Sequence, residues 1–82
     1  MSKWEKLIQR IKTLDKNLRF EEIRKVLESF GYEMTVHGGS HHTFRKKGCR
    51  KITIPKHSVI KTIYVETVRD VIEEEEKRNE NS

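Results

Sequence analysis

The sequence predicts an α+β domain in which two helices precede three antiparallel strands and a last helix. Apolar residues recur at helical spacing as far as residue 30, alternate after Gly31, and return to helical spacing after Pro55. The chain has 82 residues, so we expect one domain over 1–82 with a single small core.

Two amphipathic helices are predicted at the start of the chain. In residues 2–13 the apolar side chains share one face, and Ser2 precedes Glu5 at capping-box spacing. We expect Trp4 to pack in the core, because it lies on this apolar stripe and a role in base stacking is less favoured. A second stripe in residues 19–30 leads to Gly31, where a left-handed C-terminal cap is expected.

Three strands are expected in residues 32–36, 40–45 and 51–54, with Pro55 ending the third. Gly38-Gly39 is typical of a hairpin turn, and residues 46–49 form the next turn.

Alternation within the second strand separates its side chains. If Phe44 faces the core, His42 does too, and His41, Thr43 and Arg45 point to solvent or substrate.

After a basic loop at 56–61, Val65, Val68, Val71 and Ile72 define the last helix, which we expect to fray before Asn79. Residues 73–82 are expected to form a charged helix end or tail with its glutamates solvated. Two helices can cover one face of the sheet and leave the other open. Apart from the first helix, this order is that of the double-stranded-RNA-binding domain.

Positive charge is concentrated in the strands and the loop that follows them. The chain carries a net charge of +5, and no acidic residue occurs between Glu33 and Glu66. Such a surface favours a polyanion such as RNA, although a merely solvated face is the alternative. With no signal peptide or apolar span and only one cysteine, Cys49, we expect a cytoplasmic protein with no membrane partner.

The segment Gly39-Ser40-His41-His42-Thr43-Phe44 resembles the signature of the HicA toxin family. Its flanks agree: Phe30-Gly31-Tyr32 precedes the first strand, and Ile52-Thr53-Ile54-Pro55-Lys56-His57 closes the third. The resemblance covers about residues 18–73, which leaves 1–17 as an N-terminal helical extension that adds to the core or to a partner contact.

The resemblance implies a type II toxin of double-stranded-RNA-binding-domain-like fold that cleaves mRNA without the ribosome. It also implies a HicB-type antitoxin that covers the active site, and it assigns catalysis to His41. A histidine can move protons near neutral pH, so we expect neither a metal nor another cofactor. The residues expected to bind RNA are Gly39, Ser40, Arg45, Lys46, Lys47, Arg50, Lys51, Lys56 and Lys61.

Other interpretations stay open. The same face could belong to a non-catalytic RNA-binding module, or to an interaction module that docks an acidic protein. His42 is expected to be packed rather than catalytic, and Ser40 to shape the turn or bind a phosphate. A zinc site of His37, His41 and His42 is disfavoured, since cysteine and carboxylate ligands are lacking nearby.

Overall fold

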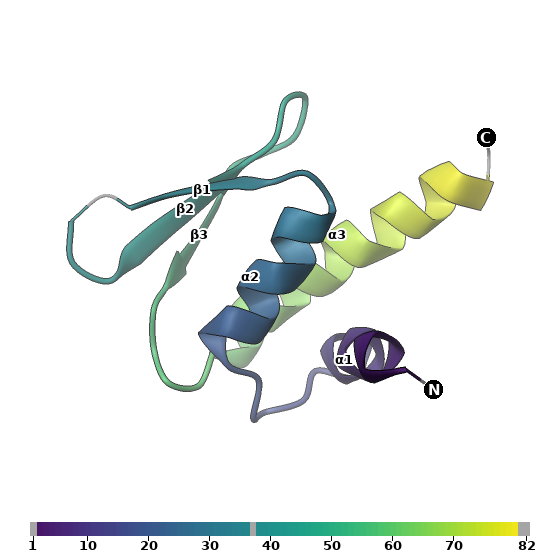
Figure 1. The fold of residues 1–82 in the computed structure, drawn as a ribbon, viewed down its shortest axis with the longest axis horizontal. Helices are drawn as coiled ribbons and strands as arrows, with labels where there is room; N and C mark the ends of the chain where they lie inside the picture. The colour runs from purple at the N-terminus through teal and green to yellow at the C-terminus, as the bar shows by residue number, and fades with distance from the viewer. Residues whose placement is uncertain (1, 37, 81–82) are drawn as a thin grey trace.

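The computed structural model describes residues 2–36 and 38–80 and contains the elements in the predicted order. The α+β class and the extra N-terminal helix are confirmed (Figure 1). The elements are α1 (Lys3–Lys12), α2 (Phe20–Ser29), β1 (Glu33–Val36), β2 (His41–Arg45), β3 (Ile52–Pro55) and α3 (Thr62–Glu80). His37 lies outside the described residues. Helix α3 runs to Glu80, so the expected fraying before Asn79 is wrong.

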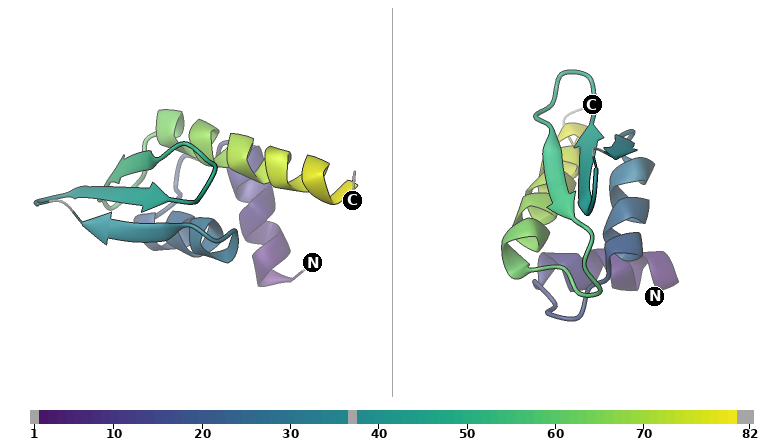
Figure 2. Two further views of the ribbon diagram at one scale, coloured as in Figure 1. Left: turned by 90° about the horizontal axis from the view of Figure 1, so that it is seen from above. Right: turned by 90° about the vertical axis from the view of Figure 1, so that its left-hand side faces the viewer.

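The sheet is antiparallel, with β2 between β1 and β3. Phe44 of β2 stands opposite Met34 of β1 and Ile52 of β3, and all three face the helices. Seen from the sheet side, α2 and α3 lie behind it and no helix covers the near face (Figure 2, left). The predicted open face is therefore present.

The hydrophobic core fills the space between the sheet and the helices. Phe44 and Ile54 from the sheet are fully buried together with Ile23 of α2 and Val68 of α3. Each of these residues lies on the apolar face of its own helix or strand, which is why the periodicity of the sequence predicts the packing.

Helix α1 extends this core. It crosses α3 part-way along its length (Figure 2, left), and Ile11 is fully buried in the core. Arg10 Nη1 donates to Glu22 Oε2 of α2 at 2.7 Å, and Lys12 Nζ donates to Glu76 Oε2 of α3 at 2.7 Å. Both contacts come from the C-terminal half of α1.

The expectation that Trp4 packs in the core is wrong. Its relative exposure is 42%, whereas Ile11, two turns later on the same stripe, is fully buried. Burial increases along α1 from Trp4 through Leu7 to Ile11, because only the C-terminal half of this crossing helix lies over α2 and α3.

Glycines supply the backbone turns that the sequence predicted. Gly31 ends α2 with φ of 93°, and Gly38 and Gly39 have φ of 57° and 61°. A Cβ at Gly38 or Gly39 would meet nothing within 4 Å, so the requirement there is for a left-handed backbone rather than for space.

We predict that Ile11→Ala lowers the free energy of unfolding by about 2–4 kcal/mol, because it leaves a cavity among α1, α2 and α3. Urea denaturation of the full chain measures this loss. Lys6→Ala, an exposed change on the same helix, should shift stability by less than about 0.5 kcal/mol. Equal effects of the two changes would contradict a core role for α1.

Candidate functional site

The central strand β2 presents different side chains to its two faces. His41 and Arg45 are exposed on the open face, whereas Phe44 is fully buried and His42 is 8% exposed beneath the sheet. The alternation predicted for these residues is confirmed.

His41 lies at the end of β2 where the chain enters from the Gly38-Gly39 turn. Its cross-strand neighbour is Pro55, the last residue of β3. Within residues 2–36 and 38–80, its ring has no hydrogen-bond partner and is exposed. The imidazole is therefore accessible to a ligand on the open face.

The backbone just before His41 is held from two directions. The carbonyl oxygen of Ser40 accepts a hydrogen bond from the Lys56 backbone N–H at 2.6 Å and one from His42 Nδ1 at 3.0 Å. Because a carbonyl oxygen only accepts, Nδ1 of His42 must carry the hydrogen. This assigns the Nδ1–H form to His42 when its ring is neutral.

The ring of His42 packs on Phe20, the first residue of α2. Their centroids are 4.8 Å apart at an interplanar angle of 60°, and Lys56 Nζ lies 5.8 Å from the Phe20 centroid. His42 thus ties the start of β2 to α2, as expected for a packed histidine. Phe20 was missed as a supporting residue, because its helical stripe indicates only that it is apolar.

Three threonines cross the open face in one row. Thr43 of β2 stands opposite Thr35 of β1 and Thr53 of β3. Thr43 Oγ1 is 3.4 Å from Thr53 Oγ1, and Thr35 Oγ1 lies 3.5 Å from the Thr43 carbonyl oxygen. Thr43 points away from the core as predicted, yet it is only 6% exposed, because both neighbouring strands shield it.

A basic hollow of about 650 Å³ lies at the opposite end of β2 from His41. Arg45, Lys47 and Lys51 are exposed in it, and within the described residues none of them forms an ion pair. Glu33 also lines the hollow, directly opposite Arg45 in the sheet. The hollow is completed by Gly31, Lys46 and Cys49.

Lys46 differs from its neighbours because its ammonium group is already paired. Nζ donates to Glu75 Oε1 of α3 at 2.7 Å and lies 5.7 Å from the Tyr32 ring centroid. The hydrogen bond from Lys46 holds the pKa of Glu75 below its usual range. Part of the glutamate run therefore joins α3 to the rest of the fold, through Glu75 here and through Glu76 to Lys12.

The remaining candidate RNA contacts are spread over the molecule. Gly39, Ser40 and Lys56 are exposed beside His41, and Lys61 is exposed just before α3. Arg50 lines a separate cavity on the α3 side. The structure therefore separates the predicted basic residues into several groups rather than gathering them around His41.

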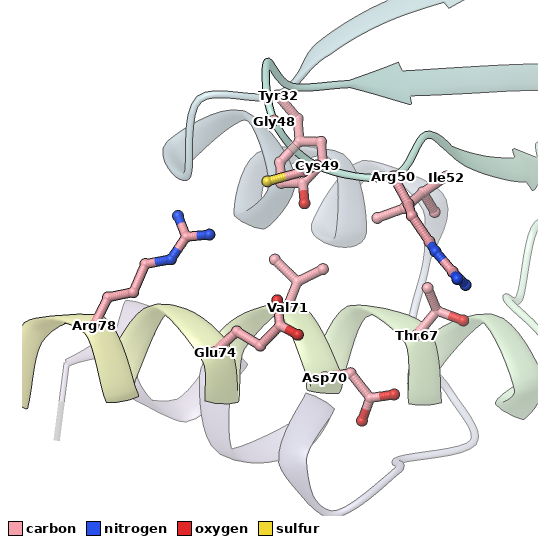
Figure 3. Close-up of a pocket in the computed structure, with 10 residues that line it drawn as sticks. All are labelled: Tyr32, Gly48, Cys49, Arg50, Ile52, Thr67, Asp70, Val71, Glu74 and Arg78. Atoms are coloured by element: carbon pink, nitrogen blue, oxygen red, sulfur yellow. The ribbon is translucent and has the colours of Figure 1, made fainter.

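That second cavity, of about 550 Å³, lies between the β2–β3 turn and α3. Figure 3 shows Tyr32 and Cys49 on the side of the β2–β3 turn, with Arg78 extending toward them from α3, which also carries Asp70 and Glu74. Its charged lining is mixed, unlike that of the basic hollow. Burial, followed by the neighbouring Cys49 and glutamates, raises the pKa of Tyr32 to about 12.

A zinc site of His37, His41 and His42 gains no support from this geometry. His41 and His42 point to opposite faces of β2, and His37 lies outside the described residues. In the described part of the chain, no cluster of three or more His, Cys, Asp or Glu side chains could hold a metal ion. No described helix is both long and apolar enough to cross a membrane.

A family model described as "HicA toxin of bacterial toxin-antitoxin" matches residues 20–74, which is more than half of the chain. The chain belongs to the HicA toxin family. It is the toxin of a toxin–antitoxin system, with a cognate antitoxin as its partner. The match begins at α2 and leaves out α1. No curated protein and no solved structure matches the chain.

In this HicA toxin, we predict that His42→Ala lowers the free energy of unfolding by about 2–3 kcal/mol, through lost packing on Phe20 and a lost hydrogen bond. His57→Ala removes an exposed histidine and should cost less than about 0.5 kcal/mol. Urea denaturation of both variants provides the comparison, and a silent His42→Ala would contradict the anchoring contact.

The raised pKa of Tyr32 predicts a loss of stability in alkali. Its contribution is complete below the unfolded value of 10.0 and is lost as the pH rises towards the folded value of about 12. Between these pH values, the free energy of unfolding of the HicA toxin should fall more steeply than that of its Tyr32→Phe variant. Parallel curves from the two proteins would show that burial of the hydroxyl does not shift its ionisation.

Proposed function

We propose that this HicA toxin is an endoribonuclease that cleaves mRNA independently of the ribosome and of metal ions, with His41 as the catalytic acid or base. The exposed position of His41 on the open sheet face carries this proposal. The exposed Lys56 beside His41, the net positive charge of the chain and the family membership support it.

The proposed reaction needs only groups that the chain and the RNA supply. The 2′-oxygen attacks the adjacent phosphorus as it loses its proton, and the bond from phosphorus to the 5′-oxygen breaks. The leaving oxygen gains a proton, so the products end in a 2′,3′-cyclic phosphate and a 5′-hydroxyl. An imidazole can perform either proton transfer near neutral pH.

The anchored backbone at Ser40 supports this role for His41. The two hydrogen bonds to the Ser40 carbonyl fix the peptide from which the His41 side chain projects. An orientation that is set before the substrate binds lowers the cost of reaching the reactive geometry. Lys56 is exposed next to this peptide and adds positive charge to this end of the sheet.

The partner that blocks this activity is proposed to be a HicB-type antitoxin covering the open face. A cover over His41 and the neighbouring cations would exclude RNA by occupying its surface. Gly39 and Ser40, at the hairpin beside His41, are proposed to contact the RNA backbone.

We predict that the wild-type chain expressed alone stops growth and that His41→Ala relieves the arrest. With purified protein in EDTA, His41→Ala should slow cleavage of an unstructured RNA by at least about 100-fold, the lower range of a general acid–base contribution. Mass spectrometry of the fragments should find the cyclic phosphate ends.

The His41→Ala protein must keep the thermal midpoint of the wild type, which shows that the fold survives. Lys25→Ala, an exposed change on α2, is the matched control and should keep wild-type cleavage. Growth arrest by a well-folded His41→Ala protein would overturn the role of His41. RNA binding without cleavage by the wild type would instead favour the non-catalytic RNA-binding module.

A further inference from the structure

We infer that the basic hollow lined by Arg45, Lys47 and Lys51 is a distinct subsite, which binds the second phosphate along a single-stranded RNA from the phosphate cleaved at His41. The inference rests on the proposed function. It assigns the hollow to substrate binding, separate from the chemistry.

The length of β2 sets the separation between His41 and the basic hollow. Four residues lead from His41 to Arg45, and at strand rise they span about 13 Å. A nucleotide repeat has six backbone bonds, twice the three of an amino-acid residue, so it extends to about 7 Å. About two nucleotides therefore bridge the backbone distance from His41 to Arg45.

The charges in the hollow suit one phosphate group. Arg45, Lys47 and Lys51 come from β2 and from the turn leading to β3, and within the described residues they are free of ion pairs. Lys46 is engaged by Glu75, so it contributes little to binding an anion. Glu33 opposes Arg45 and reduces the net positive charge without removing it.

Between His41 and the basic hollow, the open face of the sheet carries short, polar side chains. Thr35, Thr43 and Thr53 occupy the row between His41 and Arg45, and Thr43 is shielded by its neighbours. No long side chain of β2 rises between the two ends of the strand on this face, so a sugar–phosphate chain can follow β2 closely. Threonine hydroxyls also suit the sugar and phosphate oxygens of that chain.

The second cavity, between the turn and α3, fits this role less well. It combines Arg50 and Arg78 with Asp70 and Glu74, so side chains of both charges line it. A phosphate entering there would meet both signs of charge. The observations therefore place the remote phosphate in the basic hollow.

The test uses oligodeoxynucleotides that contain a single ribonucleotide. The lone 2′-hydroxyl defines the one cleavable phosphate, and a neutral methylphosphonate replaces each other phosphate in turn. With the full wild-type chain, neutralising the second phosphate on one side should raise KM about tenfold, the loss of one charge-assisted contact. The value of kcat should stay unchanged, because this contact is the same before and during the reaction.

For the unmodified substrate, the variant with both Arg45→Ala and Lys51→Ala should have a KM about tenfold higher than that of the wild type. Replacing the second phosphate with a methylphosphonate should not raise the KM of this variant further. Its salt dependence should be weaker, with a slope lower by about 0.7 for each lost phosphate contact. Lys25→Ala removes one positive charge from α2, outside the hollow, and it should respond to the methylphosphonate as the wild type does.

The Glu33→Gln variant should change KM in the opposite direction. Removing this carboxylate from the hollow should lower KM for the unmodified substrate by about two- to threefold, the range of a weak exposed charge interaction. The benefit should disappear when the second phosphate is neutral.

Equal sensitivity at every phosphate, or a double variant that still responds like the wild type, would overturn the subsite. Failure of the wild type to cut these substrates and an unmodified RNA would instead overturn the proposed function. The two failures are distinguishable, since the first leaves cleavage intact.

Discussion

Burial of Phe44 beneath the sheet is the constraint on which the candidate site depends. Phe44 is fully buried between Met34 and Ile52, with α2 and α3 behind it. A slip of one residue would move Phe44 to the open face and turn His41 into the core. The hydrophobic core thereby determines that His41 is exposed and His42 is packed.

Strand β2 also fixes the distance between His41 and the basic hollow. His41 lies at one end of β2, beside the Ser40 carbonyl oxygen that accepts two hydrogen bonds. The basic hollow lies at the other end. A paired central strand does not stretch, so the distance between them is constant. Under the proposed function, a flexible RNA would adapt to that distance, and a few residues of β2 would contact several nucleotides.

Some cations of this toxin form ion pairs between elements, and others remain unpaired within the described residues. Arg10, Lys12 and Lys46 pair with carboxylates from other elements and join α1, α2 and the β2–β3 turn to their neighbours. These are partly exposed pairs, so each contributes modestly to stability. Arg45 and Lys51 have no such partner within the described residues and remain available on the open face.

The sequence by itself determined the α+β class and the sides of the sheet on which His41 and His42 lie, because periodicity is local and these residues obey it. Residues 39–44 also carry the resemblance to the HicA family, which the family match confirms. Only the tertiary structure decided that Thr43 is shielded, that Trp4 is exposed, and that Glu75 pairs with Lys46. Each of these depends on contacts between segments far apart in the chain, which no local pattern encodes.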